Sequence, residues 1–78
     1  MWYVYIVECS DGTLYTGITT DIEKRINTHN KGKGARYTKT RLPVILRASF
    51  DGFDRSTASK EEYRIKQLTR QEKIKLWT

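Results

Sequence analysis

The sequence predicts an α/β fold in which a three-stranded antiparallel sheet packs against flanking helices, with the elements in the order β-β-α-β-α-α. Three observations support this fold class. Residues 2–8 and 14–18 alternate as strands do, and the Asp11-Gly12 pair between them is typical of a hairpin turn. Residues 22–29 and 58–68 repeat apolar side chains at helical spacing. An apolar run over residues 44–50 lies between these helices and supplies the third strand.

The chain is short and basic. Its 78 residues favour one domain with a small core, in which only about two-thirds of the unfolded surface becomes buried. Fifteen Lys and Arg against nine Asp and Glu give a net charge of +6, which favours a polyanionic partner such as nucleic acid. A soluble basic protein without such a partner remains the alternative. A single cysteine, Cys9, excludes an intramolecular disulfide and a metal site built on cysteines.

The N-terminal residues lack the basic segment and the cleavage site of a signal peptide. No apolar run approaches the roughly 20 residues that span a bilayer. We therefore expect a cytoplasmic protein with no membrane partner.

Tyr5 lies in the first predicted strand, and Tyr15 and Gly17 lie in the second. Because the two strands are antiparallel neighbours, Tyr5 and Tyr15 approach each other if the register places them on one face, which the sequence leaves open. A glycine inside a strand marks either a bulge or a close approach of another group. Both interpretations of Gly17 stay open.

The first predicted helix begins at Thr20, where a Thr cap with Glu23 three residues later forms a capping box. His29 lies on the core-facing stripe of this helix, and Arg25 lies beside that stripe, four residues before His29. Each alone is more often a solvated or packed side chain than a functional one. Their shared position next to the second strand favours a site.

The triplet Tyr3-Val4-Tyr5, nine further residues, the triplet Tyr15-Thr16-Gly17, and then Arg25 and His29 resemble the signature of the GIY-YIG nuclease superfamily. That signature is two such triplets on paired strands, followed by a helix that carries the arginine. Small stand-alone bacterial proteins of this superfamily are similar over nearly the whole chain, which implies a single GIY-YIG-like domain over residues 1–78.

The resemblance implies catalytic roles for four residues. In the family, the tyrosine of the second triplet takes the proton of the attacking water, and the helix arginine stabilises charge on the phosphate. A second tyrosine and a histidine orient groups nearby. These roles correspond to Tyr15, Arg25, Tyr5 and His29.

Two adjacent glutamates lie in the predicted helix that begins at Asp54 or Ser56 and continues to Leu68. Helical phase places Glu61 and Glu62 on opposite flanks of the apolar stripe, so periodicity leaves open which one points inward. The resemblance implies that Glu62 binds a divalent metal ion, for which Mg²⁺ is the expected species. A short third helix is expected over residues 71–77.

Residues 31–41 carry five positive charges, two glycines and no acidic side chain, and Pro43 follows. Glycines let backbone N–H groups approach phosphates, Lys and Arg neutralise them, and an aromatic ring stacks on a base or sugar. We expect a loop that binds nucleic acid, with a solvated connecting loop as the alternative. The candidate contact residues are Lys31, Lys33, Arg36, Tyr37, Lys39 and Arg41.

Two functions follow from these observations. The first is a metal-dependent endonuclease that hydrolyses phosphodiester bonds in DNA, in DNA repair or processing. The second is a catalytically weak or inactive nucleic-acid-binding module of the same fold, because the first triplet lacks its glycine. DNA is favoured over RNA as the partner, although no base-reading element is evident.

Overall fold

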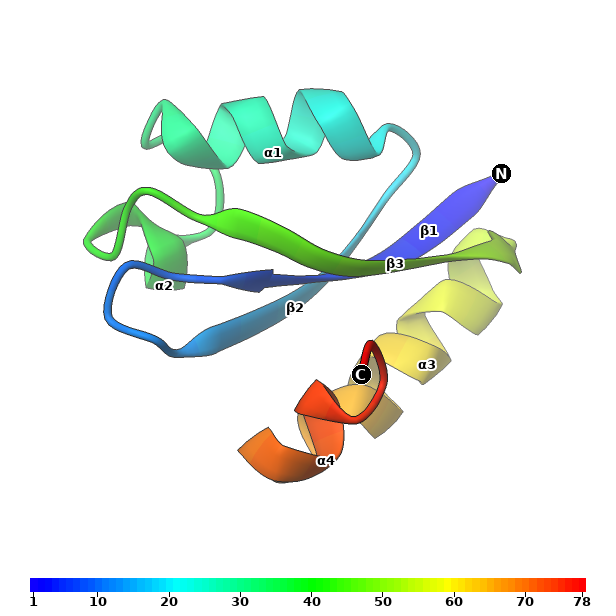
Figure 1. Cartoon of the computed structure of the whole chain (residues 1–78). Helices are drawn as coiled ribbons and strands as arrows, with labels where there is room; N and C mark the ends of the chain where they lie inside the picture. The colour runs from blue at the N-terminus through cyan, green and yellow to red at the C-terminus, as the bar shows by residue number, and fades with distance from the viewer.

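The structure is a computed structural model that describes residues 1–78, and it confirms the three-stranded antiparallel sheet (Figure 1). Strand β1 (Trp2–Glu8) is central, between β2 (Leu14–Thr19) and β3 (Ile45–Phe53). Helix α1 (Ile22–Asn30) covers one face of the sheet, and the short α2 (Arg36–Lys39) packs against α1. Helix α3 (Arg55–Lys66) covers the other face, and α4 (Arg70–Ile74) lies on the same side of the sheet as α3.

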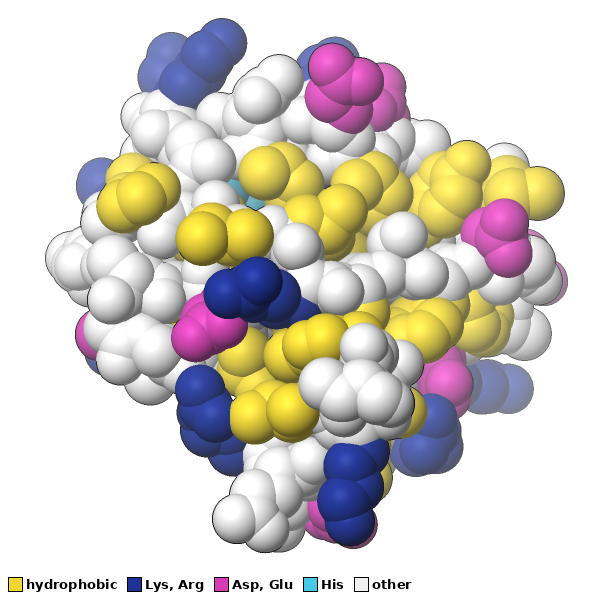
Figure 2. Space-filling model, in the orientation of Figure 1, with side chains coloured by type: hydrophobic (Ala, Val, Ile, Leu, Met, Phe, Trp, Pro, Cys, Tyr) yellow, Lys and Arg dark blue, Asp and Glu magenta, His cyan; other side chains and the backbone are white.

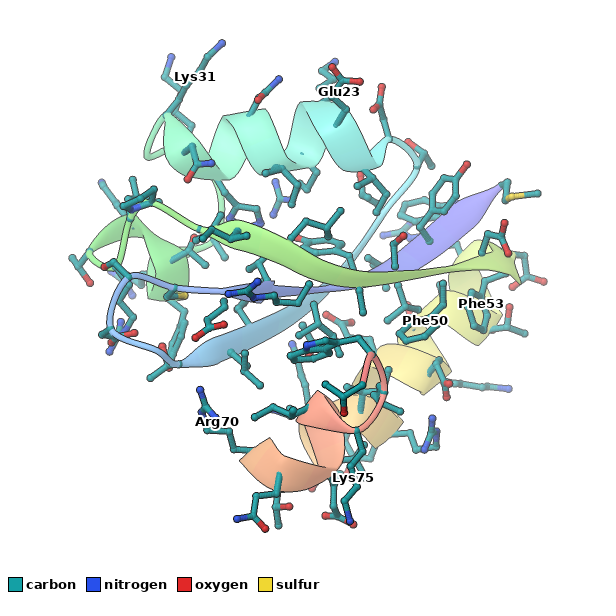
Figure 3. All side chains as sticks on the ribbon, in the orientation of Figure 1. Glu23, Lys31, Phe50, Phe53, Arg70 and Lys75 are labelled. Atoms are coloured by element: carbon teal, nitrogen blue, oxygen red, sulfur yellow. The ribbon has the colours of Figure 1, made fainter.

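Alternation along β1 divides the core into two layers, because successive side chains of a strand point to opposite faces. One layer lies between the sheet and α3, where Phe50 and Phe53 of β3 also point (Figure 3). The second lies between the sheet and α1. The buried apolar members are Val4, Ile6, Ala58 and Ile65 in the first layer, and Tyr5, Val7, Cys9 and Val44 in the second.

The predicted limits of the third strand are wrong at both ends. Val44 lies outside the ladder, because its backbone N–H donates to the Asn30 side chain at 2.8 Å and its carbonyl accepts from the same side chain at 3.3 Å. At the other end, Gly52 adopts a φ of +89°, which glycine tolerates. The strand therefore continues to Phe53, which pairs with Trp2.

The first helix begins one residue later than predicted. Asp21 is its N-cap, and the Asp21 carboxylate accepts a hydrogen bond from the backbone N–H of Lys24 at 3.1 Å. The capping box predicted for Thr20 and Glu23 is therefore wrong. A carboxylate at this position also interacts favourably with the positive end of the helix dipole.

The limits of the last two helices also follow from their caps. Asp54, rather than Ser56, caps α3 in a reciprocal box with Thr57. Thr69 caps α4 and is extended there, with a ψ of 165°. A continuous helix through Leu68 is therefore excluded, and α3 ends at Lys66. The expected helix over 71–77 is shorter and covers Arg70–Ile74 instead.

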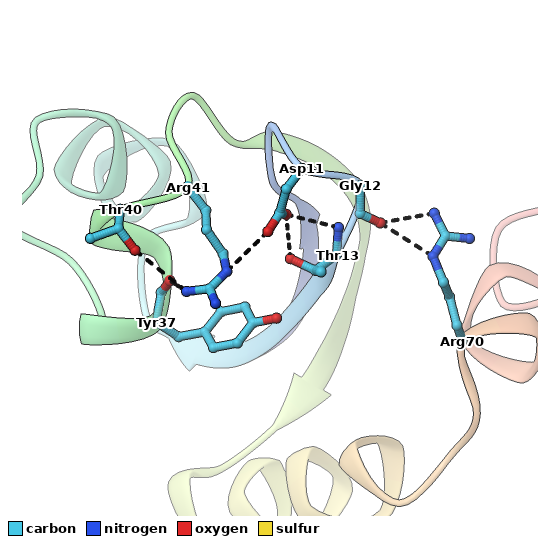
Figure 4. A network of polar contacts seen from close by, with 7 residues as sticks. All are labelled: Asp11, Gly12, Thr13, Tyr37, Thr40, Arg41 and Arg70. Atoms are coloured by element: carbon cyan, nitrogen blue, oxygen red, sulfur yellow. Dashed lines mark hydrogen bonds and ion pairs between the residues drawn. The ribbon is translucent and has the colours of Figure 1, made fainter.

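The β1–β2 hairpin turn is held from two sides by arginines (Figure 4). Arg41, which follows α2, contacts the Asp11 carboxylate at 3.1 Å. Arg70 of α4 donates two hydrogen bonds to the Gly12 carbonyl oxygen, at 3.2 and 2.9 Å. The turn thus connects the segment around α2 with α4.

Apolar side chains form a band across the face along which β3 runs, and most of the Lys and Arg side chains in this view lie at its margins (Figure 2). Ile45 and Leu46 are the exposed large apolar residues of β3. None of the helices is long and apolar enough to cross a membrane.

Thr16 is buried, and its hydroxyl has no hydrogen-bond partner. An unsatisfied buried polar group costs about 1–3 kcal/mol, so Thr16→Val is expected to raise the free energy of unfolding by about 1 kcal/mol, as measured by urea titration. Thr38 is the matched control, because its buried hydroxyl donates to the Ala35 carbonyl oxygen at 3.0 Å. Thr38→Val should lower stability, and equal shifts in the two variants would contradict this assignment.

Candidate active site

Tyr5 and Tyr15 lie on the same face of the sheet. The register pairs Tyr5 with Gly17 and Val7 with Tyr15, so the two tyrosines are diagonal neighbours with ring centroids 6.5 Å apart. Gly17 is a position of close approach and not a bulge, because the β1–β2 pairing is regular. A Cβ atom at Gly17 would lie 2.5 Å from the Tyr5 hydroxyl oxygen, so the Tyr5 ring occupies the space of a side chain.

Arg25 and His29 of α1 meet at the Tyr5 hydroxyl, as their spacing predicts. The Nε of Arg25 donates to the Tyr5 oxygen at 3.2 Å. The Nε2 of His29 lies 2.8 Å from the same oxygen, and both Tyr5 and His29 are fully buried. One phenol hydroxyl therefore joins β1 to two successive turns of α1.

Burial is the main influence on the protonation of Tyr5 and His29, which form a hydrogen-bonded cluster with Arg25. It raises the pKa of Tyr5 above its usual value, although the hydrogen bond and the charge of Arg25 act in the opposite direction. Burial and the neighbouring Arg25 charge both lower the pKa of His29. At neutral pH the Tyr5 hydroxyl therefore keeps its proton and the His29 ring is uncharged.

Two further residues contact His29, and the sequence did not predict these contacts because both residues lie in the basic stretch 31–41. The hydroxyl oxygen of Thr38, which is fully buried, lies 2.8 Å from His29 Nδ1. A Cβ atom on Gly34 would overlap the His29 ring and lie 2.9 Å from the His29 Cα. No spacing rule marks either residue, since both contacts depend on how the segment folds back onto α1.

Tyr15 contacts the protein through its ring. The ring lies 5.5 Å from His29 and 6.1 Å from Tyr37 between centroids, and the Tyr37 ring is nearly parallel to it. The Lys66 ammonium lies 5.6 Å from the Tyr15 ring centroid. The Tyr15 ring is therefore approached by side chains from α1, α2 and α3.

The two adjacent glutamates of α3 have different partners. Glu61 accepts two hydrogen bonds from Arg64, at 2.6 and 2.9 Å, and this pairing lowers the pKa of Glu61. The Glu62 carboxylate instead lies 3.1 Å from the Lys66 ammonium that reaches over Tyr15. Lys66 thus links Glu62 to the Tyr15 ring, which places Glu62 on the side of α3 near Tyr15, and the Glu62 charge is a minor cause of the raised pKa of Tyr5.

Glu62 is the one carboxylate near this cluster, and the Lys66 ammonium already forms an ion pair with the Glu62 carboxylate. The chain contains no group of three or more His, Cys, Asp or Glu side chains that could hold a metal. A site closed by four protein ligands, as in structural zinc sites, therefore does not fit. A hard cation such as Mg²⁺ keeps several waters and binds through one or two carboxylates plus substrate phosphate. The residues present fit that mode of binding.

The basic stretch 31–41 contains the helix α2, whereas the sequence predicts a continuous loop. Its cations divide into two groups. Arg41 is bound within the protein, because it pairs with Asp11 and lies 4.1 Å from the Tyr37 ring centroid. The other four are exposed, and Lys31 projects away from the sheet (Figure 3). These four, here called the free cations, are Lys31, Lys33, Arg36 and Lys39.

Comparison with known families matches residues 1–75 to the GIY-YIG catalytic domain. A UPF0213 protein of Halobacterium salinarum is 52% identical over 77 residues, which cover 99% of this chain and 100% of that one. A UPF0213 protein of Staphylococcus haemolyticus is 55% identical over 74 residues, or 95% of this chain and 90% of that one. Close relatives therefore occur in both archaea and bacteria.

Two solved structures share the fold. The solution NMR structure of a UPF0213 protein from Bacillus halodurans has a TM-score of 0.59 at 47% identity, covering 97% of this chain and 82% of that one. The solution NMR structure of a protein from E. faecalis has a TM-score of 0.62 at 41% identity, covering 95% and 79%.

Proposed function

The chain belongs to the GIY-YIG family, and from this premise we propose that it is a metal-dependent endonuclease that hydrolyses phosphodiester bonds in DNA. The observation that carries the proposal is the convergence of Arg25 and His29 on the Tyr5 hydroxyl, beside Tyr15 and on the side faced by Glu62. A phosphodiester at this position would meet a guanidinium, a phenol and a carboxylate together.

Each side chain has a distinct task in the proposed reaction. Arg25 binds the phosphate through the terminal nitrogens of its planar guanidinium, while its Nε stays bonded to Tyr5. Tyr15 takes the proton of the attacking water. Tyr5 is an unsuitable base, because burial raises its pKa and its hydroxyl is already bonded. Tyr5 and His29 therefore orient Arg25.

Glu62 would hold the divalent cation, for which Mg²⁺ is the expected species. The cation supplies Lewis-acid stabilisation of charge on the phosphate oxygens. The Lys66 ammonium, 3.1 Å from Glu62, must give up this carboxylate when the cation binds.

The free cations suit the backbone of a polyanion. Their charges neutralise phosphates without reading bases, since the one helix among them, α2, has only four residues. We therefore expect binding that depends on charge and on the shape of the DNA.

Replacing Lys33 and Arg36 together with Ala is expected to weaken binding of all DNA sequences alike. The salt dependence of binding should flatten by about two units of slope, because two fewer phosphates release their counterions. Fluorescence anisotropy over a range of salt concentrations measures the slope. Lys60 and Lys75, two exposed cations outside this stretch, are the control, and their double Ala variant has the same net charge. Equal slopes in both double variants would assign the effect to net charge instead.

A nucleic-acid-binding module without cleavage is the second candidate function. The ion pair between Glu62 and Lys66 favours it, because a carboxylate neutralised by the protein attracts a metal less strongly.

Incubation of the purified chain with labelled single-stranded, duplex and branched DNA, in Mg²⁺ or in EDTA, tests the proposal. Cleavage of at least one substrate in Mg²⁺, and of none in EDTA, is expected. An RNA of matching sequence tests the preference for DNA. Binding without Mg²⁺-dependent cleavage of any substrate would overturn the endonuclease and support the module.

A further inference from the structure

A continuous chain of hydrogen bonds runs from α2 to Arg25 through the only histidine of the protein. The contacts of Thr38 at one end of these bonds indicate the direction of donation. The Thr38 hydroxyl donates to the Ala35 carbonyl oxygen at 3.0 Å, and a hydroxyl has only one proton. With this proton on the Ala35 side, the Thr38 oxygen can only accept from His29 Nδ1, 2.8 Å away. In this arrangement the Nδ1 atom carries the imidazole proton.

The direction of the other two hydrogen bonds follows from the neutral state of His29. Burial and the Arg25 charge lower its pKa, and a neutral imidazole with a proton on Nδ1 has a bare Nε2. The Tyr5 hydroxyl therefore donates to Nε2 at 2.8 Å. This leaves the Tyr5 oxygen to accept from Arg25 Nε at 3.2 Å.

The opposite tautomer would weaken the chain at Arg25. With the proton on Nε2, His29 would donate to the Tyr5 oxygen, and the Tyr5 proton would have to point toward another acceptor. A guanidinium has donors only, so the Tyr5 proton would find no acceptor on Arg25, and the Arg25 Nε–H would share the Tyr5 oxygen with the Nε2–H of His29. The contact that orients Arg25 would be weakened.

We propose that Thr38 is a positioning residue, which holds His29 in the tautomer protonated on Nδ1 and thereby fixes the side chain of Arg25. Its significance for cleavage depends on the proposed function, whereas the tautomer does not. Thr38 belongs to α2, which also carries two of the free cations, Arg36 and Lys39. Thr38 therefore links the helix that carries these two cations to Arg25 through His29 and Tyr5.

Because the protein has one histidine, long-range ¹⁵N–¹H NMR spectra of the imidazole report the tautomer without ambiguity. The parent and Thr38→Ser should both show the proton on Nδ1, since serine keeps the acceptor. Thr38→Val should move the main population to Nε2 and displace the Arg25 Nε–H resonance. Thr40→Val, at an exposed position two residues later, is the control and should leave both signals in place.

The parent spectrum alone decides part of the question, even if Thr38→Val fails to fold. A parent protonated on Nε2 overturns the proposal, and so does a folded Thr38→Val variant with unchanged His29 and Arg25 signals. Where the parent cleaves DNA, Thr38→Val should lower kcat about 100-fold with a small change in KM, because misplacement of about 1 Å has this effect. Thr38→Ser should restore kcat. A parent without cleavage would overturn the proposed function, while the spectra would still decide the role of Thr38.

Discussion

Glu62→Gln is expected to reduce Mg²⁺-dependent cleavage of DNA at least about 100-fold while leaving DNA binding level or slightly tighter. Glutamine keeps the size and much of the hydrogen-bonding shape of the side chain but removes the charge. The cation then loses the one carboxylate that faces the cluster of Tyr5, Tyr15 and Arg25. Binding of DNA persists, because a negative charge near the phosphates has been removed. Single-turnover cleavage and fluorescence anisotropy measure the two effects separately.

Glu61→Gln is the matched control for this experiment. It changes the net charge identically, and it breaks a pair on the same helix, the one between Glu61 and Arg64. Exposed pairs of this kind contribute only about 0.3–0.5 kcal/mol, so circular dichroism should show both variants folded. Cleavage by Glu61→Gln should stay close to that of the parent. Equal losses in the two variants would remove the metal-binding role from Glu62.

Gly34→Ala is expected to lower the free energy of unfolding by about 1–3 kcal/mol, the usual effect of overpacking a buried contact. The added methyl group would overlap the His29 ring and lie 2.9 Å from the His29 Cα. A backbone atom cannot rotate away, so the segment that carries Thr38 must move off α1. Urea titration measures the stability, and the His29 imidazole resonances report the displacement.

Gly32→Ala provides the comparison, two residues earlier. Gly32 has a φ of +77°, and a Cβ atom there would meet only Leu42, at 3.9 Å. Alanine is strained at such a φ, at a cost of about 1 kcal/mol, but it leaves His29 untouched. The two variants should therefore differ in the NMR signals of His29 more than in stability. A parent-like stability and spectrum for Gly34→Ala would show that Gly34 does not pack on His29.

The sequence predicted those features that depend on period and local order. Alternation in the first strand gave the correct two faces, and the spacing of Arg25 and His29 gave their meeting at one point. The choice between Thr20 and Asp21 as the helix cap could not be made from type alone, since both residues are good caps. The end of the third strand could not be predicted, because a glycine at a positive φ, as at Gly52, occurs both in turns that end a strand and in bulges that let it continue.

Long-range contacts explain what the sequence did not predict. Thr38 and Gly34 lie in a stretch whose charge suggested a solvated, phosphate-binding loop, and only the fold brings them onto His29. In the same way, Glu61 and Glu62 are equivalent by helical phase, and their partners Arg64 and Lys66 distinguish them. Glu62→Gln tests the role of Glu62 in metal binding, and the catalytic roles of Tyr5, Tyr15, Arg25 and His29 remain predictions.

The central position of β1 has a consequence for how the chain folds. Its pairing with β2 needs only a short turn, whereas its pairing with β3 joins Tyr5 to Ser49 across the segment that carries α1 and α2. Loop-closure entropy delays such non-local pairings. Until β3 pairs with β1, the backbone N–H and C=O groups along that edge of β1 are free to pair with another chain. A refolding yield that falls as protein concentration rises is therefore the expected result.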